Sequence, residues 1–168
     1  MKKILLLSDN HGYLDDKILA HAAAADEIWH AGDWGDYENL ILLEKMKKVR
    51  GVYGNIDGET FRNALPEIAV FECEGLKVCI KHIGGYPGRY ANGVKNLLLD
   101  KKPDLFISGH SHICKVIRDA NLKLLHFNPG ACGKHGFHHI RTLMRFVVTQ
   151  GAIQNLEIIE LGKRATID

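Results

Sequence analysis

Short apolar runs alternate with amphipathic segments over the first third of this chain, and apolar runs follow one another directly over the last third. The early runs are almost wholly apolar, which is typical of strands that are covered on both faces. The segments between them place their apolar residues on one side of a helix. The pattern therefore predicts strands at residues 2–8, 27–31 and 49–53 and helices at residues 13–25 and 37–47, in a right-handed parallel arrangement.

The pattern changes after residue 58. Residues 58–66 are polar and without strong periodicity, which predicts an irregular connection. A hairpin follows at residues 67–73 and 76–82, then a flexible loop at 84–88 and a helix of about a dozen residues that begins at Arg89. The last predicted strands are residues 104–108, 113–119, 122–127, 143–149 and 152–161. This order favours an α/β (α+β) fold in which two sheets pack face to face with helices outside them.

Composition narrows the class of protein. A chain of 168 residues with 46% hydrophobic and 25% charged residues predicts one globular domain, residues 1–168. A net charge of +2 makes no case for a nucleic-acid surface. No apolar stretch approaches the roughly 20 residues of a membrane span, and the stretch after Lys2-Lys3 is too short for a signal peptide. We therefore expect a cytoplasmic protein without a membrane partner.

The cysteines disfavour two common types of site, whereas the histidines suggest metal binding. The four cysteines form no Cys-x-x-Cys pair, which disfavours a zinc ribbon or a thioredoxin-like motif. The ten histidines are many for this length, and several lie with carboxylates or an amide at predicted strand ends. Those candidate metal ligands are Asp9, His11, Asp33, Asn55, His82, His110 and His112.

The position of these residues suggests one shared site. Open α/β sheets bind ligands at the carboxyl ends of their strands. In extended chain, the two residues of Asp9-x-His11, and likewise of His110-x-His112, point to the same side. Taken singly, each candidate is also compatible with a turn former, a surface residue or a hydrogen-bonded edge histidine. The number of candidates at strand ends favours a site in which Asp33 is shared between two clusters of metal ligands.

Oxygen and nitrogen ligands without thiolate suit manganese, iron, nickel or zinc better than calcium. A bridging carboxylate can hold two such ions ~3.5–4 Å apart, with an acidified hydroxide between them. We therefore expect two divalent transition-metal ions, with manganese favoured and nickel, iron or zinc as alternatives.

The motifs Asp9-x-His11, Gly32-Asp33-x-x-Asp36, Gly54-Asn55-x-Asp57, His82 and Gly109-His110-x-His112 resemble, in this order, those of the calcineurin-like metallophosphoesterase superfamily. The short length and the Gly-Asn-Ile-Asp variant are most similar to its small bacterial and archaeal phosphodiesterase branch. The resemblance runs from residue 2 to about residue 130 and implies a four-layer β-sandwich flanked by helices. It also implies two sets of metal ligands. The first set is Asp9, His11, Asp33 and His112, and the second is Asp33, Asn55, His82 and His110.

Within that resemblance, Asp33, Asn55 and His82 are the predicted catalytic residues. Many family members carry a histidine after the Asn ligand that is thought to assist the leaving group, and this chain has Ile56 there. The loop at residues 133–141 is a candidate source of substrate contacts or a replacement proton donor; its alternative is a solvated loop with incidental histidines. The candidates for orienting ligands or contacting substrate are Asp36, Asp57, His30, His135, His138, His139 and Arg141.

The leading functional hypothesis is a metal-dependent phosphohydrolase that acts on small phosphoesters, in particular phosphodiesters. The alternative is a protein-interaction scaffold, because the retromer's metallophosphoesterase-like subunit resembles this fold and uses it to bind partners. A metal-stabilised nucleotide sensor is a third hypothesis. The presence of every expected ligand type favours the enzyme, although fold does not fix function. A homo-oligomer is compatible with the sequence, which does not set the oligomeric state.

Overall fold

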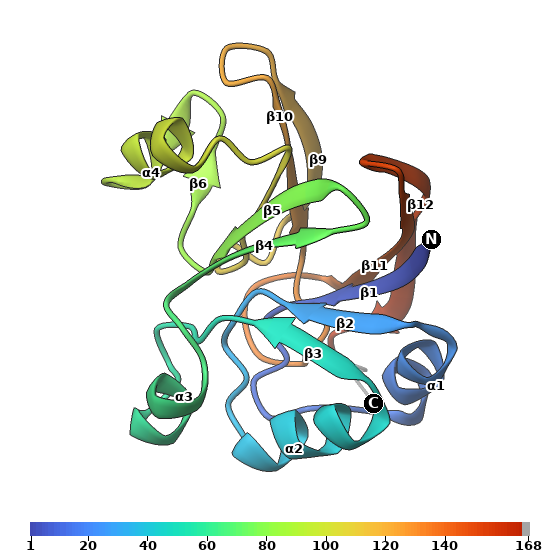
Figure 1. Cartoon of the computed structure of the whole chain (residues 1–168). Helices are drawn as coiled ribbons and strands as arrows, with labels where there is room; N and C mark the ends of the chain where they lie inside the picture. The colour runs from blue at the N-terminus through green and yellow to red at the C-terminus, as the bar shows by residue number, and fades with distance from the viewer. Residues whose placement is uncertain (166–168) are drawn as a thin grey trace.

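The computed structural model describes residues 1–165, and within them two five-stranded sheets pack face to face between helices (Figure 1). The first sheet has the order β12-β11-β1-β2-β3. Its strands are β1 (Lys2–Leu7), β2 (Glu27–His30), β3 (Lys48–Gly51), β11 (Ile140–Thr149) and β12 (Ala152–Lys163). β1, β2 and β3 are parallel, as the alternation of apolar runs and helices predicts, whereas β11 runs antiparallel to both β1 and β12.

The second sheet has the order β4-β5-β8-β10-β9, and its middle strands β5, β8 and β10 are parallel. Its strands are β4 (Ile68–Cys73), β5 (Leu76–Lys81), β8 (Leu105–Ile107), β9 (Cys114–Asp119) and β10 (Leu124–Pro129). Each sheet thus has a parallel centre, and the carboxyl ends of parallel strands carry ligand sites.

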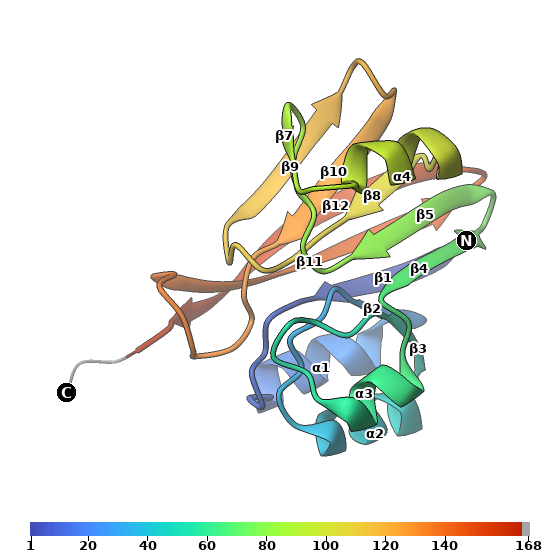
Figure 2. The same cartoon turned by 90° about the vertical axis from the view of Figure 1, so that its left-hand side faces the viewer.

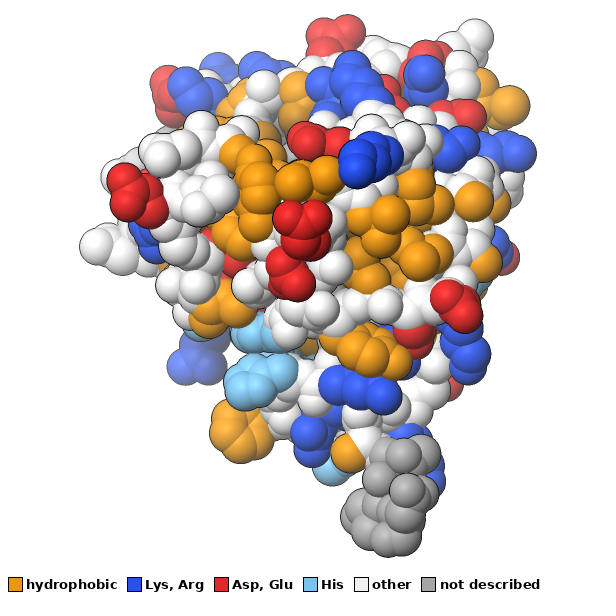
Figure 3. Space-filling view, turned by 90° about the horizontal axis from the view of Figure 1, so that it is seen from below, with side chains coloured by type: hydrophobic (Ala, Val, Ile, Leu, Met, Phe, Trp, Pro, Cys, Tyr) orange, Lys and Arg blue, Asp and Glu red, His pale blue; other side chains and the backbone are white. Residues whose placement is uncertain are grey.

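Helices cover the two outer faces, which gives the four layers seen edge-on in Figure 2. α1 (Asp16–Ala24), α2 (Tyr37–Met46) and α3 (Glu59–Ala64) lie on the outer side of the first sheet, and α4 (Val94–Lys101) lies on the outer side of the second. Three apolar cores separate these layers, and the one between the sheets contains Trp29 and Phe127. Figure 3 shows the helical face from below, where apolar side chains are interrupted by acidic ones and histidines reach the surface at one edge. Within residues 1–165, no helix is long and apolar enough to cross a membrane.

Two predicted elements are wrong. The connection at residues 58–66 contains α3, whose six residues bury only Phe61, too few to produce a periodic signal. The predicted helix from Arg89 begins instead at Val94, because Arg89–Tyr90 forms strand β7 and pairs with β6 (Gly85–Tyr86). Gly85 has φ +69°, and a Cβ there would meet the backbone of Arg89, so this tight hairpin requires glycine.

Candidate functional site

The candidate ligands come together where the carboxyl ends of β1, β2, β3, β5 and β8 meet between the sheets. Five of them have left-handed backbone, a region that Asn, Asp and His tolerate better than other non-glycine residues. They are Asp9 (φ 54°), His11 (φ 45°), Asp33 (φ 59°), His110 (φ 67°) and His112 (φ 59°). The chain therefore turns sharply directly after each strand, and such strained positions concentrate at functional sites.

Glycines allow these turns to pack closely. A Cβ at Gly54 would collide with the carboxylate and the backbone nitrogen of Asp33. A Cβ at Gly109 would collide with Ser8 Oγ and with the carboxylate of Asp9. Both glycines directly precede candidate ligands, so the chain can approach the neighbouring carboxylate only because these positions lack a side chain.

The first cluster contains Asp9, His11 and His112. His112 Nε2 lies 3.1 Å from Asp9 Oδ1, and His11 Nε2 lies 3.9 Å from the same oxygen. Asp9 Oδ1 and His11 Nε2 are buried and find no hydrogen-bond partner among the described residues. Unsatisfied buried polar atoms are costly, and their convergence on one point fits a cation there.

The second cluster contains Asp33, His82 and His110, with Asn55 between the two rings. Asn55 Oδ1 lies 3.0 Å from His82 Nε2 and 2.9 Å from His110 Nδ1. His82 Nε2 also lies 3.2 Å from Asp33 Oδ1. The nitrogen and oxygen atoms of four side chains therefore face a common point.

The carboxylate of Asp33 belongs to both clusters. Its Oδ1 faces His82, and its Oδ2 lies 3.5 Å from His11 Nε2. Burial raises the pKa of Asp33, but the hydrogen bond and charge of His82 and the N–H of Ile56 outweigh it, so the pKa lies below its ordinary value. Asp33 is therefore held as a carboxylate, which a bridging ligand must be.

Hydrogen bonds fix the ring orientation of His82. Its Nδ1 lies 2.7 Å from the carbonyl oxygen of Ala31 and must donate a proton to it. Its Nε2 then faces two oxygen acceptors, from Asp33 and Asn55, so a proton or a metal cation has to lie between them. Burial lowers the pKa of His82, whereas Asp33 and Asp9 raise it above the ordinary value. A proton and a metal cation would each place positive charge at Nε2 of His82.

Comparison with known proteins identifies the family. The family model of the calcineurin-like phosphoesterase superfamily domain matches residues 1–151. This chain belongs to that superfamily. A "Probable metallophosphoesterase" of Mycoplasma pneumoniae is 32% identical over 119 residues, which cover 67% of this chain and 69% of that protein. Another from Methanothermobacter thermautotrophicus is 33% identical over 104 residues, or 62% of this chain, and the match spans 59% of the relative's own length.

Solved structures confirm the phosphoesterase fold. Thermotoga maritima protein TM1076 superimposes with a TM-score of 0.74 at 27% identity, covering 96% of this chain and 100% of that one. Vps29 from Entamoeba histolytica gives 0.74 at 15% identity, with coverages of 95% and 99%. A structure described as a novel archaeal phosphodiesterase gives 0.66 at 20% identity, with the same coverages. The predicted two-sheet architecture flanked by helices is thus confirmed.

Asp57 and Asp36, which the sequence suggests as supporting residues of this candidate site, have different surroundings. The buried Asp57 carboxylate accepts hydrogen bonds from four backbone N–H groups. The donors are Asp33 (3.0 Å), Trp34 (2.9 Å), Gly35 (3.1 Å) and Gly54 (2.7 Å). Asp57 thereby joins the loop after β2 to the loop after β3. Asp36 is exposed and caps α2 by accepting from Glu38 N at 3.0 Å.

His30 lies behind the site and is fully buried. Its Nδ1 accepts from Gly32 N at 3.0 Å, so its Nε2 carries the proton and donates to Asn10 Oδ1 at 2.9 Å. Burial holds the pKa of His30 well below its ordinary value. The neutral ring stacks on Trp34 with 3.5 Å between centroids and so supports the turn that carries Asp33.

The loop after β10 brings one histidine against a candidate ligand. His138 Nε2 donates to Gly133 O at 2.9 Å, so in the neutral ring Nδ1 is an acceptor. His112 Nδ1 lies 3.2 Å from that atom and can donate to it, which leaves the lone pair of His112 Nε2 directed at Asp9. Burial lowers the pKa of His138 and so favours the neutral ring.

The other candidates of this loop are less engaged. His135 is exposed, with its ring centroid 4.9 Å from that of His11, and His139 is exposed as well. Arg141 was expected in the loop, but it lies in β11 and is buried. Its Nη2 donates to Asp15 at 2.9 Å and its Nε donates to Cys132 O at 2.8 Å, so these two donors already have partners within the fold.

Sequence reasoning missed three polar residues that support the site. Ser8 donates to Asp9 Oδ2, and Asn10 accepts from His30. Asn128 donates to the carbonyl oxygen of Gly109 at 2.9 Å and so fixes the turn before His110. Asn128 is marked in the sequence by the motif Asn128-Pro129-Gly130, whereas Ser8 and Asn10 are marked only by being next to Asp9.

Proposed function

We propose that this protein is a metal-dependent phosphodiesterase that acts on small phosphodiesters at a site for two divalent ions. The observation that carries the proposal is the position of Asp33, whose two carboxylate oxygens face different clusters at 3.5 and 3.2 Å from a histidine nitrogen. A carboxylate shared in this way is the arrangement that two-metal hydrolases use. Membership of the calcineurin-like phosphoesterase superfamily supports the same chemistry.

The donor sets fit divalent transition metals. The first ion would be held by Asp9, His11, Asp33 and His112, and the second by Asp33, Asn55, His82 and His110. No thiolate takes part, and the buried Asp9 Oδ1 and His11 Nε2, which lack a protein partner among the described residues, gain one. When bound, divalent ions would supply positive charge that neutralises the phosphoryl oxygens and would lower the pKa of water at the site.

The residues of the chain supply orientation and a rigid frame. Ala31 O fixes the ring of His82, and His138 fixes that of His112, so each presents Nε2 to the site. The four N–H groups at Asp57 hold two ligand loops at a fixed separation, which positions Asp33 relative to Asn55. Orientation of this kind is needed because misplaced ligands reduce metal affinity and turnover.

The proposal is tested by hydrolysis of bis(p-nitrophenyl) phosphate and p-nitrophenyl phosphate with defined metals. We expect chelation to abolish turnover, manganese or nickel to restore it and calcium to leave it lost, with a preference for the diester. Asp33→Asn should lower turnover by about 100-fold or more, because only Asp33 has an oxygen facing each of the two clusters. Asp36→Asn, which changes an exposed carboxylate of the same loop, is the matched control.

Two results would contradict the proposal. The first is full turnover by a preparation that elemental analysis shows to be free of metal. The second is an Asp33→Asn variant that binds two equivalents of metal and keeps most of its turnover. Metal binding without hydrolysis of either ester would instead support a protein-interaction scaffold, the alternative that the fold of Vps29 leaves open.

A further inference from the structure

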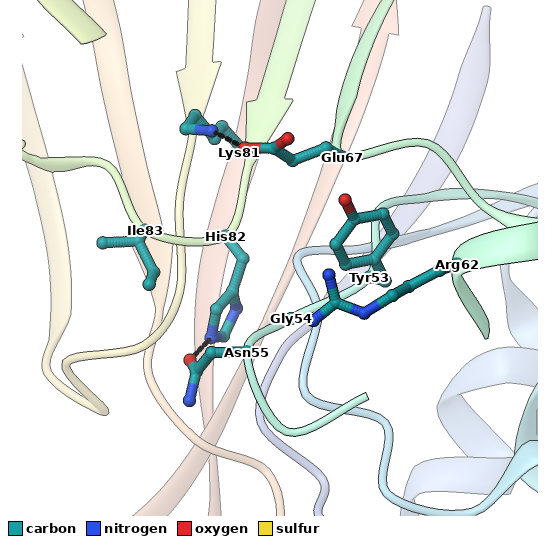
Figure 4. Close-up of a pocket in the computed structure, with 8 residues that line it drawn as sticks. All are labelled: Tyr53, Gly54, Asn55, Arg62, Glu67, Lys81, His82 and Ile83. Atoms are coloured by element: carbon teal, nitrogen blue, oxygen red, sulfur yellow. Dashed lines mark hydrogen bonds and ion pairs between the residues drawn. The ribbon is translucent and has the colours of Figure 1, made fainter. Parts of the chain in front are cut away.

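A cleft of about 250 Å³ opens beside the second cluster. Its lining includes Asn55 and His82 of the second cluster, together with Tyr53, Arg62 and Lys81. Figure 4 shows the guanidinium of Arg62 under the Tyr53 ring, with its end directed towards Gly54 and the pair of Asn55 and His82. A phosphate bound by the second cluster would therefore lie at the mouth of this cleft.

The fold holds Arg62 in place without using all its donors. Arg62 Nε donates to the carbonyl oxygen of Asp57 at 3.1 Å, and its guanidinium carbon lies 4.6 Å from the centroid of the Tyr53 ring. Within residues 1–165, the two terminal NH₂ groups of Arg62 make no hydrogen bond. A guanidinium that is fixed in this way offers a pre-organised fork, and such forks suit phosphate and carboxylate groups.

Charge in the cleft is unevenly compensated. Lys81 forms an ion pair with Glu67, which Figure 4 shows on the opposite side of the cleft from Asn55. This pair leaves Arg62 as the surplus cation among the lining residues that the structure describes. The carboxylate of Glu67 also interacts with the charge of Arg62, and so it reduces the positive potential in the cleft.

We infer that this cleft binds a second phosphate of the substrate, with Arg62 as the residue that contacts it. The substrate class is then a phosphodiester that carries a further phosphate on one of its ester groups, with the scissile phosphate at the two clusters. The inference rests on the proposed function, because the cleft becomes a substrate site only if the clusters hold the scissile phosphate. It also gives Glu67 an opposing effect, since its charge disfavours an anion in the cleft.

The test is calorimetric binding to the manganese-loaded protein of thymidine 3′,5′-bisphosphate, thymidine 5′-phosphate and thymidine 3′-phosphate. Wild type should bind the bisphosphate about tenfold more tightly than the better monophosphate, as expected for an additional, partly exposed charge-assisted contact. Arg62→Gln should reduce this ratio to about two, the residual attraction of the metals for extra charge. Glu67→Gln should increase it, and Arg118→Gln, which changes an exposed residue of β9, should leave it unchanged.

The outcomes separate this inference from the proposed function. A ratio near one in wild type, or a ratio that Arg62→Gln and Glu67→Gln both leave unchanged, would overturn the second-phosphate site. If Arg62→Gln does not fold, Glu67→Gln still decides, because it must raise the ratio. The same preparations are assayed with bis(p-nitrophenyl) phosphate. Hydrolysis without bisphosphate preference overturns only the inference, whereas preference without hydrolysis upholds the anion site and counts against the proposed phosphodiesterase.

Discussion

Replacement of Asp57 by asparagine is the most informative perturbation of the frame around the site. The carboxylate is buried, and each of its oxygens accepts two backbone N–H groups. Asparagine keeps one acceptor oxygen and places an NH₂ group against the other pair of donors. Two of the four hydrogen bonds are therefore lost, whichever way the amide is oriented.

The magnitude follows from the burial of those donors. A buried donor left without a partner costs about 1–3 kcal/mol. The less costly orientation directs the NH₂ group at Trp34 and Gly35, because Gly35 is exposed and water can reach its N–H. The N–H groups of Asp33 and Gly54 would then donate to an uncharged amide oxygen, which binds them more weakly than a carboxylate does. In total, we expect Asp57→Asn to lose about 3 kcal/mol of unfolding free energy, or roughly 6–12 °C in Tm.

The assay is equilibrium urea unfolding in excess chelator, so that bound metal does not contribute to apparent stability. Asp36→Asn is the matched control: asparagine caps a helix about as well as aspartate, so only the interaction with the helix dipole is lost, worth less than about 1 kcal/mol. Equal unfolding free energies for the two variants would refute the role assigned to Asp57. Metal titration should in addition show weaker binding in Asp57→Asn, because two ligand loops lose their common anchor.

Three further predictions concern histidines and the leaving group. His138→Ala should weaken zinc binding by about 10–100-fold, as for other residues that orient ligands, whereas His139→Ala should not. Equal zinc affinities of these two variants in calorimetry would contradict the orientation of His112 by His138. Because this chain has Ile56 in place of a histidine, its turnover should depend steeply on the pKa of the leaving group. Ile56→His should flatten this dependence, because general acid catalysis raises rates by ~10²–10⁴-fold. A shallow slope in wild type would show that another group donates the proton. Burial lowers the pKa of His126 from 6.5 to about 4. As the pH falls, this imidazole is therefore protonated in the unfolded chain before it is protonated in the folded one, and the unfolding free energy should fall between pH 6.5 and 4. An equal decline in His126→Gln would disprove this.

Much of the fold was predictable because its signals are local. An apolar run such as Ile4–Leu7 predicts a buried strand from its own residues, and each candidate ligand directly follows such a run. The spacing in Asp9-x-His11 and His110-x-His112 could therefore be interpreted as ligand pairs at strand ends, but the assumption of extended chain was wrong, because all four residues have positive φ. The elements missed, α3 and the β6–β7 hairpin, are too short to show a period.

The sequence by itself determined which residues end strands and which chemistry they carry. Only the tertiary structure decided how they are used. Asp36 and Asp57 look equivalent in sequence, yet one caps a helix in solvent and the other binds four N–H groups from loops that precede it by 3 to 24 residues. Arg62 of α3 lines the same cleft as Lys81 of β5 only because the fold brings these two distant segments to one pocket. Periodicity reports the face on which a side chain lies, whereas its partners come from distant segments that meet only when both sheets pack together.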